Sequence, residues 1–215
     1  AFEERFGTSP SSVDTFESIS LRDYFPLGNL QQSYVYTDQS YQVTITALGD
    51  DRYQFKYDDS DCYRVTEKRS DGIYLVEIQC PDDNYRSEFT DYMIFPAEMT
   101  PGEPMFISGS VARYKDDQLE RTEALSYTIT LIGQSTYDFN GATYQSIDIM
   151  YGNSMSHVET YAEGLGYVTD GYLKLSDFQA SDIDEWKSSS SGSGGAINPF
   201  WLLIALVGLA FRRRA

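Results

Sequence analysis

Apolar and polar residues alternate with a period of two over much of the chain between residues 24 and 176. The clearest alternation covers residues 41–47, 53–57, 127–131 and 147–151. Turn-forming sequences separate these runs: Gly49-Asp50-Asp51, Asp58-Asp59-Ser60, Asp71-Gly72, Pro81-Asp82-Asp83-Asn84, Asn140-Gly141, Gly152-Asn153 and Asp170-Gly171. Short alternating runs at this spacing predict an antiparallel all-β domain with one buried face.

The strand order can be a meander or a wrapped sheet, and two similar halves are a further option. The segment Tyr24-Phe25-Pro26-Leu27 precedes the alternating run 40–46, and Ile94-Phe95-Pro96-Ala97 precedes the run 126–130. The stretch 113–126 is the one part of this body whose secondary structure the pattern leaves ambiguous.

The two cysteines, Cys62 and Cys80, flank one predicted hairpin with strands at 61–69 and 72–80. A three-residue loop, Ser70-Asp71-Gly72, with Gly72 in a left-handed conformation, would pair Cys62 with Cys80 directly. At a non-hydrogen-bonded pair the Cα atoms lie about 4.5 Å apart, within reach of a disulfide. The competing two-residue turn Asp71-Gly72 would misalign the sulfurs, so we predict the bridged arrangement. Two buried free thiols are the alternative.

The last 28 residues have a different composition. Residues 188–195 contain only Ser and Gly, which is typical of a flexible linker, and an uncharged apolar run follows at 196–211. A single transmembrane helix is predicted, and a buried C-terminal helix is the alternative; at roughly 1.5 Å per residue the run is short for a span. Its expected anchors are Pro199 at the first turn, Phe200, Trp201 and Phe211 at the interfaces, and Arg212, Arg213 and Arg214 at the cytoplasmic end.

The linker, the pair Gly194-Gly195, the short apolar helix and the terminal arginines together resemble the GlyGly-CTERM sorting tail of Gram-negative bacteria. This resemblance implies cleavage near the glycine pair by a rhombosortase, a rhomboid-type intramembrane serine protease. It also implies passage through the inner membrane and periplasm and delivery to the cell surface or medium, commonly by type II secretion. The polar start, which begins with Ala1, suggests that an export signal has been removed.

The body also resembles a group of uncharacterised exported bacterial proteins. Members open with a Tyr-Phe-Pro-Leu segment and Gly-Asn, found here at residues 24–29, and close with Tyr-Ala-x-Gly-x-Gly, found here at residues 161–166. The Trp that usually follows Gly-Asn is replaced by Tyr34 and Tyr36 on the same strand. The resemblance implies export and no particular activity. The chain is thus divided into an N-terminal extension (1–19), a β-domain (20–187), a linker (188–195) and a transmembrane sorting tail (196–215).

Charge and composition exclude several functions. The 16 basic and 33 acidic residues give a net charge of −17, and without Arg212–Arg214 it is −20, which disfavours nucleic-acid binding. One histidine and two cysteines disfavour zinc sites, and no cofactor is expected. The acidic clusters at 50–51, 58–61, 82–84, 116–117 and 182–185 could bind Ca²⁺, but turn chemistry explains them better.

Catalytic candidates are few. His157 is the single imidazole, and its neighbours on one strand point to opposite faces, so a Ser–His–acid triad is not indicated. The 18 tyrosines could form a sugar-stacking platform, although cross-strand ring contacts are the more common use. We expect a non-enzymatic surface or secreted protein that binds a polysaccharide or protein partner through an open sheet edge or a concave face. The alternative is an exported hydrolase acting on polysaccharide or another extracellular polymer.

Overall fold

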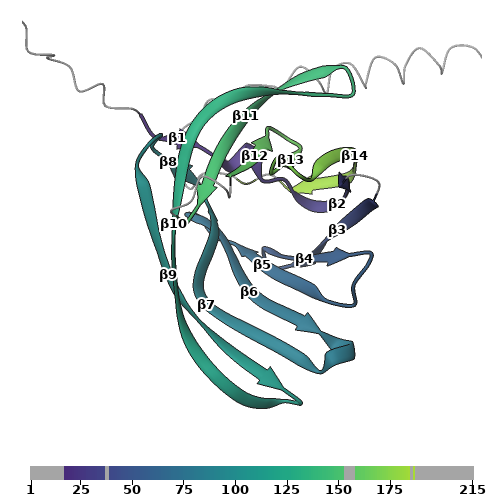
Figure 1. Cartoon of the computed structure of the whole chain (residues 1–215), viewed down its shortest axis with the longest axis vertical. Coiled ribbons are helices and arrows are strands. Elements are labelled where there is room, and N and C mark those ends of the chain that lie inside the picture. Colours follow the sequence, from purple (N-terminus) through teal and green to yellow (C-terminus); the bar gives the residue numbers. More distant parts are fainter. Residues whose placement is uncertain (1–16, 37–38, 153–157, 185, 187–215) are drawn as a thin grey trace, which may run out of the picture.

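The computed structural model describes residues 17–36, 39–152, 158–184 and 186 (Figure 1). Almost all of this part of the chain is β-structure, and its helices are two single turns, η1 (Arg22–Tyr24) and η2 (Pro81–Asp83). The strands are β1 (Ile19–Ser20), β2 (Leu27–Tyr36), β3 (Gln39–Gly49), β4 (Arg52–Tyr57), β5 (Tyr63–Lys68), β6 (Gly72–Cys80), β7 (Tyr85–Pro96), β8 (Glu98–Met99), β9 (Pro104–Lys115), β10 (Gln118–Phe139), β11 (Ala142–Tyr151), β12 (Val158–Ala162), β13 (Gly166–Thr169) and β14 (Lys174–Asp184). The predicted all-β class is confirmed.

Twelve of these strands form one closed antiparallel barrel in the order β10-β11-β12-β13-β14-β2-β3-β4-β5-β6-β7-β9, with β9 returning to β10. Nearly every strand pairs with its neighbour in sequence, so the barrel is a meander. There are two exceptions: β7 pairs with β9, because β8 leaves the wall to pair with β1, and β2 pairs with β14, which closes the barrel. Because the sheet closes on itself, the open edge that we expected as a binding surface does not exist on it.

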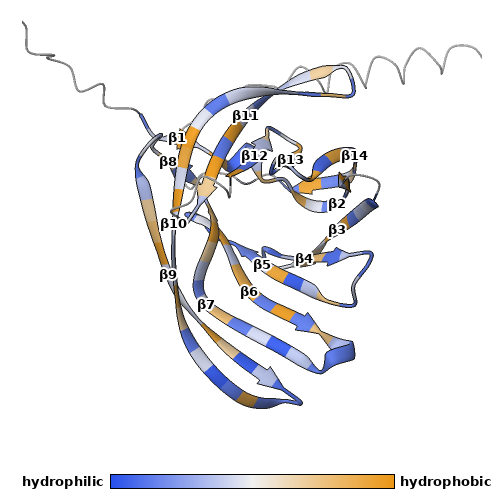
Figure 2. Ribbon diagram, viewed as in Figure 1, coloured by the Kyte–Doolittle hydropathy of each residue, from blue (hydrophilic) through white to orange (hydrophobic). Residues whose placement is uncertain are grey.

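The period-two pattern correctly identified which residues face inward. Val43 and Ile45, Tyr53 and Phe55, Ile129 and Leu131, and Ile147 and Ile149 are all buried. Figure 2 shows the same alternation of hydrophobic and hydrophilic positions along the strands. The ambiguous stretch 113–126 contains the end of β9, the turn and the start of β10. The first half of β10 pairs with β9, and its second half pairs with β11.

Acidic and amide residues make the tight turns between strands. Asp50 and Asp51 have positive φ angles of 52° and 58°, and Asp116 and Asp117 have φ angles of 49° and 59°. Two consecutive residues at positive φ give the type I′ turn whose twist matches that of the flanking strands. The same geometry recurs at Asn140-Gly141. These acidic pairs therefore have a structural role as turns.

A short segment before β2 closes one end of the barrel. Leu21, at the start of η1, is fully buried, and its backbone N–H donates to the carbonyl of Ala97 at 2.8 Å. The N–H of Gly164 donates to the carbonyl of Asp23 at 2.7 Å. These bonds join the segment to the β7–β8 connection and to the β12–β13 turn, so it forms a floor across the barrel end.

The helices in the described part of the chain are too short and too polar to cross a membrane. The predicted transmembrane tail and the Ser/Gly linker lie outside the described residues, as does most of the N-terminal extension.

Candidate functional site

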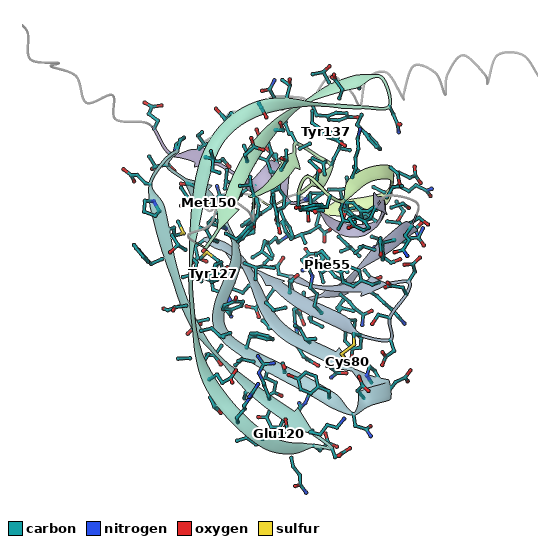
Figure 3. All side chains as sticks on the ribbon, viewed as in Figure 1. Phe55, Cys80, Glu120, Tyr127, Tyr137 and Met150 are labelled. Atoms are coloured by element: carbon teal, nitrogen blue, oxygen red, sulfur yellow. A yellow bond between two sulfur atoms is a disulfide. The ribbon has the colours of Figure 1, made fainter. Side chains whose placement is uncertain are left out.

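The barrel contains a cavity of about 1020 Å³ that is large enough to hold a ligand. Its wall is mainly aromatic, and Figure 3 shows the side chains of Phe55 and Tyr127 inside the barrel. Ten tyrosines line it: Tyr34, Tyr36, Tyr41, Tyr57, Tyr92, Tyr127, Tyr151, Tyr161, Tyr167 and Tyr172. Ligand pockets in proteins commonly measure about 300–1,000 Å³ and are lined by apolar and aromatic groups. The cavity has the size and lining of a small-molecule site.

The floor of the cavity is built from phenylalanines that come from distant parts of the sequence. Phe25, which follows η1, lies 4.9 Å from Phe95 and 6.1 Å from Phe55 between ring centroids. Phe95 in turn lies 5.0 Å from Tyr161. The two Phe-Pro segments that resemble each other in the sequence therefore meet at the floor. Tilted ring packing of this kind stabilises the pairs beyond their burial.

The mouth lies at the opposite end, where β2, β4 and β13 end. Tyr36, Tyr57 and Tyr172 stand there with 41%, 37% and 73% of their surfaces exposed, and Asp59 and Asp170 are beside them. The Asp170 carboxylate accepts hydrogen bonds from the backbone N–H groups of Tyr172 and Leu173, at 2.9 and 2.8 Å. Burial raises the pKa of Asp170, but these bonds outweigh it and hold the pKa below its ordinary value. Asp170 is thus occupied in shaping the turn.

Several tyrosine hydroxyls in the cavity are bonded to the wall. Tyr34 donates to the carbonyl of Tyr167 at 3.0 Å, and Tyr127 donates to the carbonyl of Met93. Tyr161 donates to the carboxylate of Glu159, and its oxygen lies 3.0 Å from that of Tyr151. The polar atoms of this wall are therefore directed into a network, and the ring faces are left for a ligand.

The environment around these rings is of low polarity. Burial is the main cause that raises the pKa values of Tyr34, Tyr127, Tyr151 and Tyr161 well above the ordinary tyrosine value. The Glu159 carboxylate adds to the rise at each of them because it repels a second negative charge. All four hydroxyls are neutral at physiological pH.

Among the residues that the structure describes, one basic side chain reaches this cavity. Arg64, on β5, lines the wall, and its guanidinium carbon lies 4.6 Å from the centroid of the Phe55 ring. Since Phe55 pairs with Arg64 across β4 and β5, the ring and the guanidinium lie on the same inner face.

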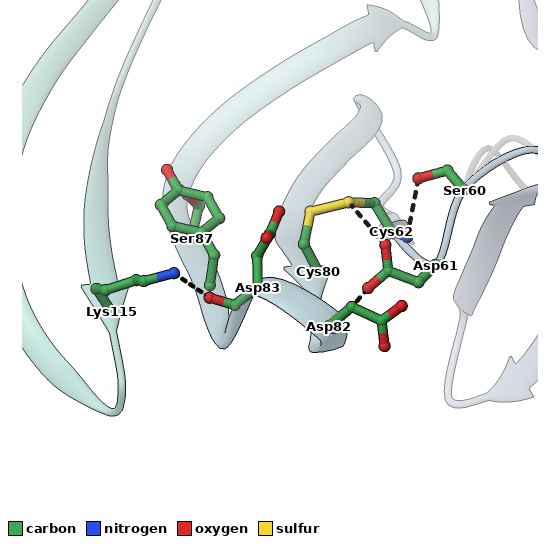
Figure 4. The surroundings of a disulfide bond; sticks show 9 residues. Ser60, Asp61, Cys62, Cys80, Asp82, Asp83, Ser87 and Lys115 are labelled. Atoms are coloured by element: carbon green, nitrogen blue, oxygen red, sulfur yellow. Dashed lines mark hydrogen bonds between the residues drawn. A yellow bond between two sulfur atoms is a disulfide. The ribbon is translucent and has the colours of Figure 1, made fainter.

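The predicted disulfide is present: Cys62 and Cys80 are bonded, with Cα atoms 4.0 Å apart (Figure 4). It joins the start of β5 to the end of β6 at the mouth of the barrel. The neighbouring turns are fixed by side chains, since Asp61 accepts from the N–H of Asp82 at 2.6 Å and Lys115 donates to the carbonyl of Asp83.

The hairpin reaches this register by a different route from the one predicted. The N–H of Arg69 donates to the carbonyl of Gly72 at 2.8 Å, so the loop has two residues, Ser70 and Asp71. Gly72 does not have a positive φ angle and belongs to β6. Opposite Val65 and Thr66, Val76 of β6 is bulged out of the pairing, which shifts the register by one residue and restores the alignment of the cysteines. The predicted three-residue loop was wrong: the loop has two residues, and the bulged residue makes up the difference of one in the register.

His157, the glycine pair Gly194-Gly195 and the membrane anchors at 199–201 and 211–214 lie outside the described residues. Among the residues that the structure describes, no cluster of three His, Cys, Asp or Glu side chains could hold a metal ion.

No family model, no curated protein and no solved structure matches this chain. The site therefore has to be interpreted from its own geometry. The sequence indicated the tyrosines as a possible sugar-stacking platform, with cross-strand ring contacts as the more common use, and did not indicate which of them share one cavity. The signal that was available is the number of tyrosines at inward positions of alternating strands, for example Tyr34, Tyr127 and Tyr151.

Proposed function

We propose that this protein is a non-enzymatic, exported binding protein that holds a small, largely aromatic or polycyclic ligand inside its barrel. The tyrosine-lined cavity of about 1020 Å³ carries the proposal. Flat, rigid rings favour a flat ligand that stacks on their faces. A polysaccharide is a poorer fit because the floor closes one end of the barrel, so a long chain could not pass through it.

Binding of the neutral fluorescent probe N-phenyl-1-naphthylamine to the purified protein tests the proposal. We expect saturable binding to one site, with the emission increase typical of a dry, apolar environment. Ile94 lines the cavity, so Ile94→Trp should fill part of it and weaken binding by about tenfold or more. Ile132→Trp is the matched control, because Ile132 is on the outside of β10 with 40% of its surface exposed. Absence of saturable binding, or equal binding by both variants, would overturn the proposal.

The absence of catalysis is part of the same proposal. The wall of the cavity is dominated by ring faces, and its Glu159 carboxylate already accepts the Tyr161 hydroxyl. His157→Gln should leave probe binding unchanged. A hydrolytic activity on an extracellular polymer that disappears in this variant would contradict the proposal and favour the hydrolase alternative.

The proposed location is the cell surface or the medium, after the C-terminal tail has been held in the membrane and cut near Gly194-Gly195. The Cys62–Cys80 disulfide supports export, because disulfides persist in oxidising compartments. Intact mass measurement of the surface or released protein tests the cleavage by the implied rhomboid-type protease. A mass that still includes Arg212–Arg214 would contradict it.

A further inference from the structure

Arg64 differs from most arginines of the described chain in having no partner. Five arginines lie within salt-bridge distance of a carboxylate: Arg22, Arg69, Arg86, Arg113 and Arg121. No hydrogen bond or ion pair joins Arg64 to any described residue, and its Nε atom is buried. Its guanidinium lies over the Phe55 ring and at the surface of the cavity.

An unpaired guanidinium in such a place is unfavourable in the ligand-free protein. Burial removes water from the Nε–H donor, and a buried donor without an acceptor costs free energy. The ring of Phe55 offsets part of that cost through a cation–π contact, but it supplies no hydrogen-bond acceptor. No described residue supplies the acceptor that the Nε–H of Arg64 lacks, and a bound ligand can supply it.

Glu159 does not supply the acceptor for Arg64, although Glu159 and Arg64 both line the cavity. The Glu159 carboxylate is bonded to Tyr161, on the wall formed by β11 and β12, while Arg64 is on β5. The cavity therefore has a negative group on one side and an unsatisfied positive group on another, with aromatic rings between them.

From this arrangement we infer that the ligand is an organic anion, whose carboxylate or similar oxyanion binds Arg64 while its aromatic body stacks on the tyrosines. This inference rests on the proposed binding function and specifies its ligand class. The planar guanidinium donates two parallel hydrogen bonds to an oxyanion, which fixes the orientation of the ligand as well as its charge.

A matched pair of probes tests this inference. N-phenyl-1-naphthylamine and 8-anilinonaphthalene-1-sulfonate have the same ring system, and only the second carries an oxyanion. The purified wild-type protein should bind both. Arg64→Met, which keeps most of the side-chain volume, should weaken binding of the sulfonate by at least about tenfold and change binding of the neutral probe by less than about twofold.

Lys56→Met is the control for charge. Lys56 is next to Phe55 on β4 but is exposed on the outer face, so its removal changes the net charge equally. At about 0.15 M ionic strength its charge is screened over roughly 8 Å, and binding of both probes should be unchanged. Arg64→Lys should retain part of the sulfonate binding, because it keeps the charge and loses the bidentate geometry.

Three outcomes would overturn the inference. Wild-type protein that binds the neutral probe and not the sulfonate has a cavity that excludes anions, and the proposed function would survive without it. An Arg64→Met variant that weakens both probes equally would show a structural role for Arg64. Wild-type protein that binds neither probe would remove the proposed function as well.

Discussion

At the scale of single residues, the backbone at a few positions restricts which side chains can be accommodated. Gly28 is one of them, because its φ angle is +137° and a Cβ atom there would lie 2.2 Å from the carbonyl oxygen of Asp182. The neighbouring strand β14 is bulged between Ala180 and Asp182, which brings the two backbones together.

Gly28→Ala should therefore destabilise the protein by about 3 kcal/mol or more, through backbone strain and a clash with β14. Gly133→Ala is the control, since a Cβ atom there meets nothing within 4 Å and the φ angle is ordinary. That change should be neutral or slightly stabilising. Urea unfolding of both variants measures the difference, and equal midpoints would contradict the steric argument.

The Cys62–Cys80 bond closes a loop with a sequence separation of 18 residues. Loop-closure entropy for that length gives a loss of about 3 kcal/mol in the double variant Cys62→Ser/Cys80→Ser. Unfolding of the wild type with and without a reductant should show the same loss. A variant as stable as the oxidised wild type would mean that the bond adds no stability.

At the scale of elements, the segment η1 decides whether the barrel has a floor. It is joined to two separate turns through the carbonyls of Ala97 and Asp23, and it places Phe25 beneath the cavity. The junction between β13 and β14 is weakly paired by comparison, because a single residue pair, Thr169 with Lys174, joins the two strands. The mouth therefore includes the least paired seam of the barrel.

Leu21→Ala should destabilise the protein by about 2–5 kcal/mol, because Leu21 is fully buried and its truncation leaves a cavity under the floor. Leu48→Ala is the matched control, as Leu48 is 52% exposed on β3, and it should change stability by less than about 0.5 kcal/mol. Thermal and urea unfolding measure both. Similar values for the two variants would show that η1 is not part of the folded core.

At the scale of the whole molecule, the barrel keeps many tyrosine hydroxyls away from water. In the unfolded chain a tyrosine ionises at about pH 10. In the folded protein burial raises the pKa of Tyr34, Tyr127 and Tyr151 well above that value. Below about pH 10 both states carry the proton, so these groups do not change stability with pH there.

Above about pH 10 the unfolded state releases protons that the folded state retains, so stability falls as the pH rises. Each such tyrosine contributes a slope of about 1.4 kcal/mol per pH unit, and their sum should produce cooperative alkaline unfolding. Urea midpoints between about pH 8 and pH 11 measure this, and Tyr127→Phe should flatten the slope by one residue's share. A midpoint that stays constant over that range would contradict the buried state of these rings.

Part of this structure could be predicted from the sequence, and the particular residues show why. Alternation placed Val43, Ile45 and Phe55 on the buried face correctly, because side chains on a strand point to opposite faces whatever the strand pairs with. The cysteine pairing was predicted through a wrong loop, because the bulge at Val76, opposite Val65 and Thr66, leaves no clear mark in the residue pattern.

Local periodicity and turn chemistry by themselves determined the all-β class, the inward residues and the positions of most turns, because each depends on residues close together in the chain. Only the tertiary structure decided that the sheet closes, that η1 forms its floor and that Arg64 reaches a tyrosine-lined cavity without a hydrogen-bond or ion-pair partner among the described residues. Those features depend on the distances between residues far apart in sequence, such as Phe25 and Phe95 or Arg64 and Glu159. Such distances are set by how the strands curve and pair around a common axis, which no local pattern encodes.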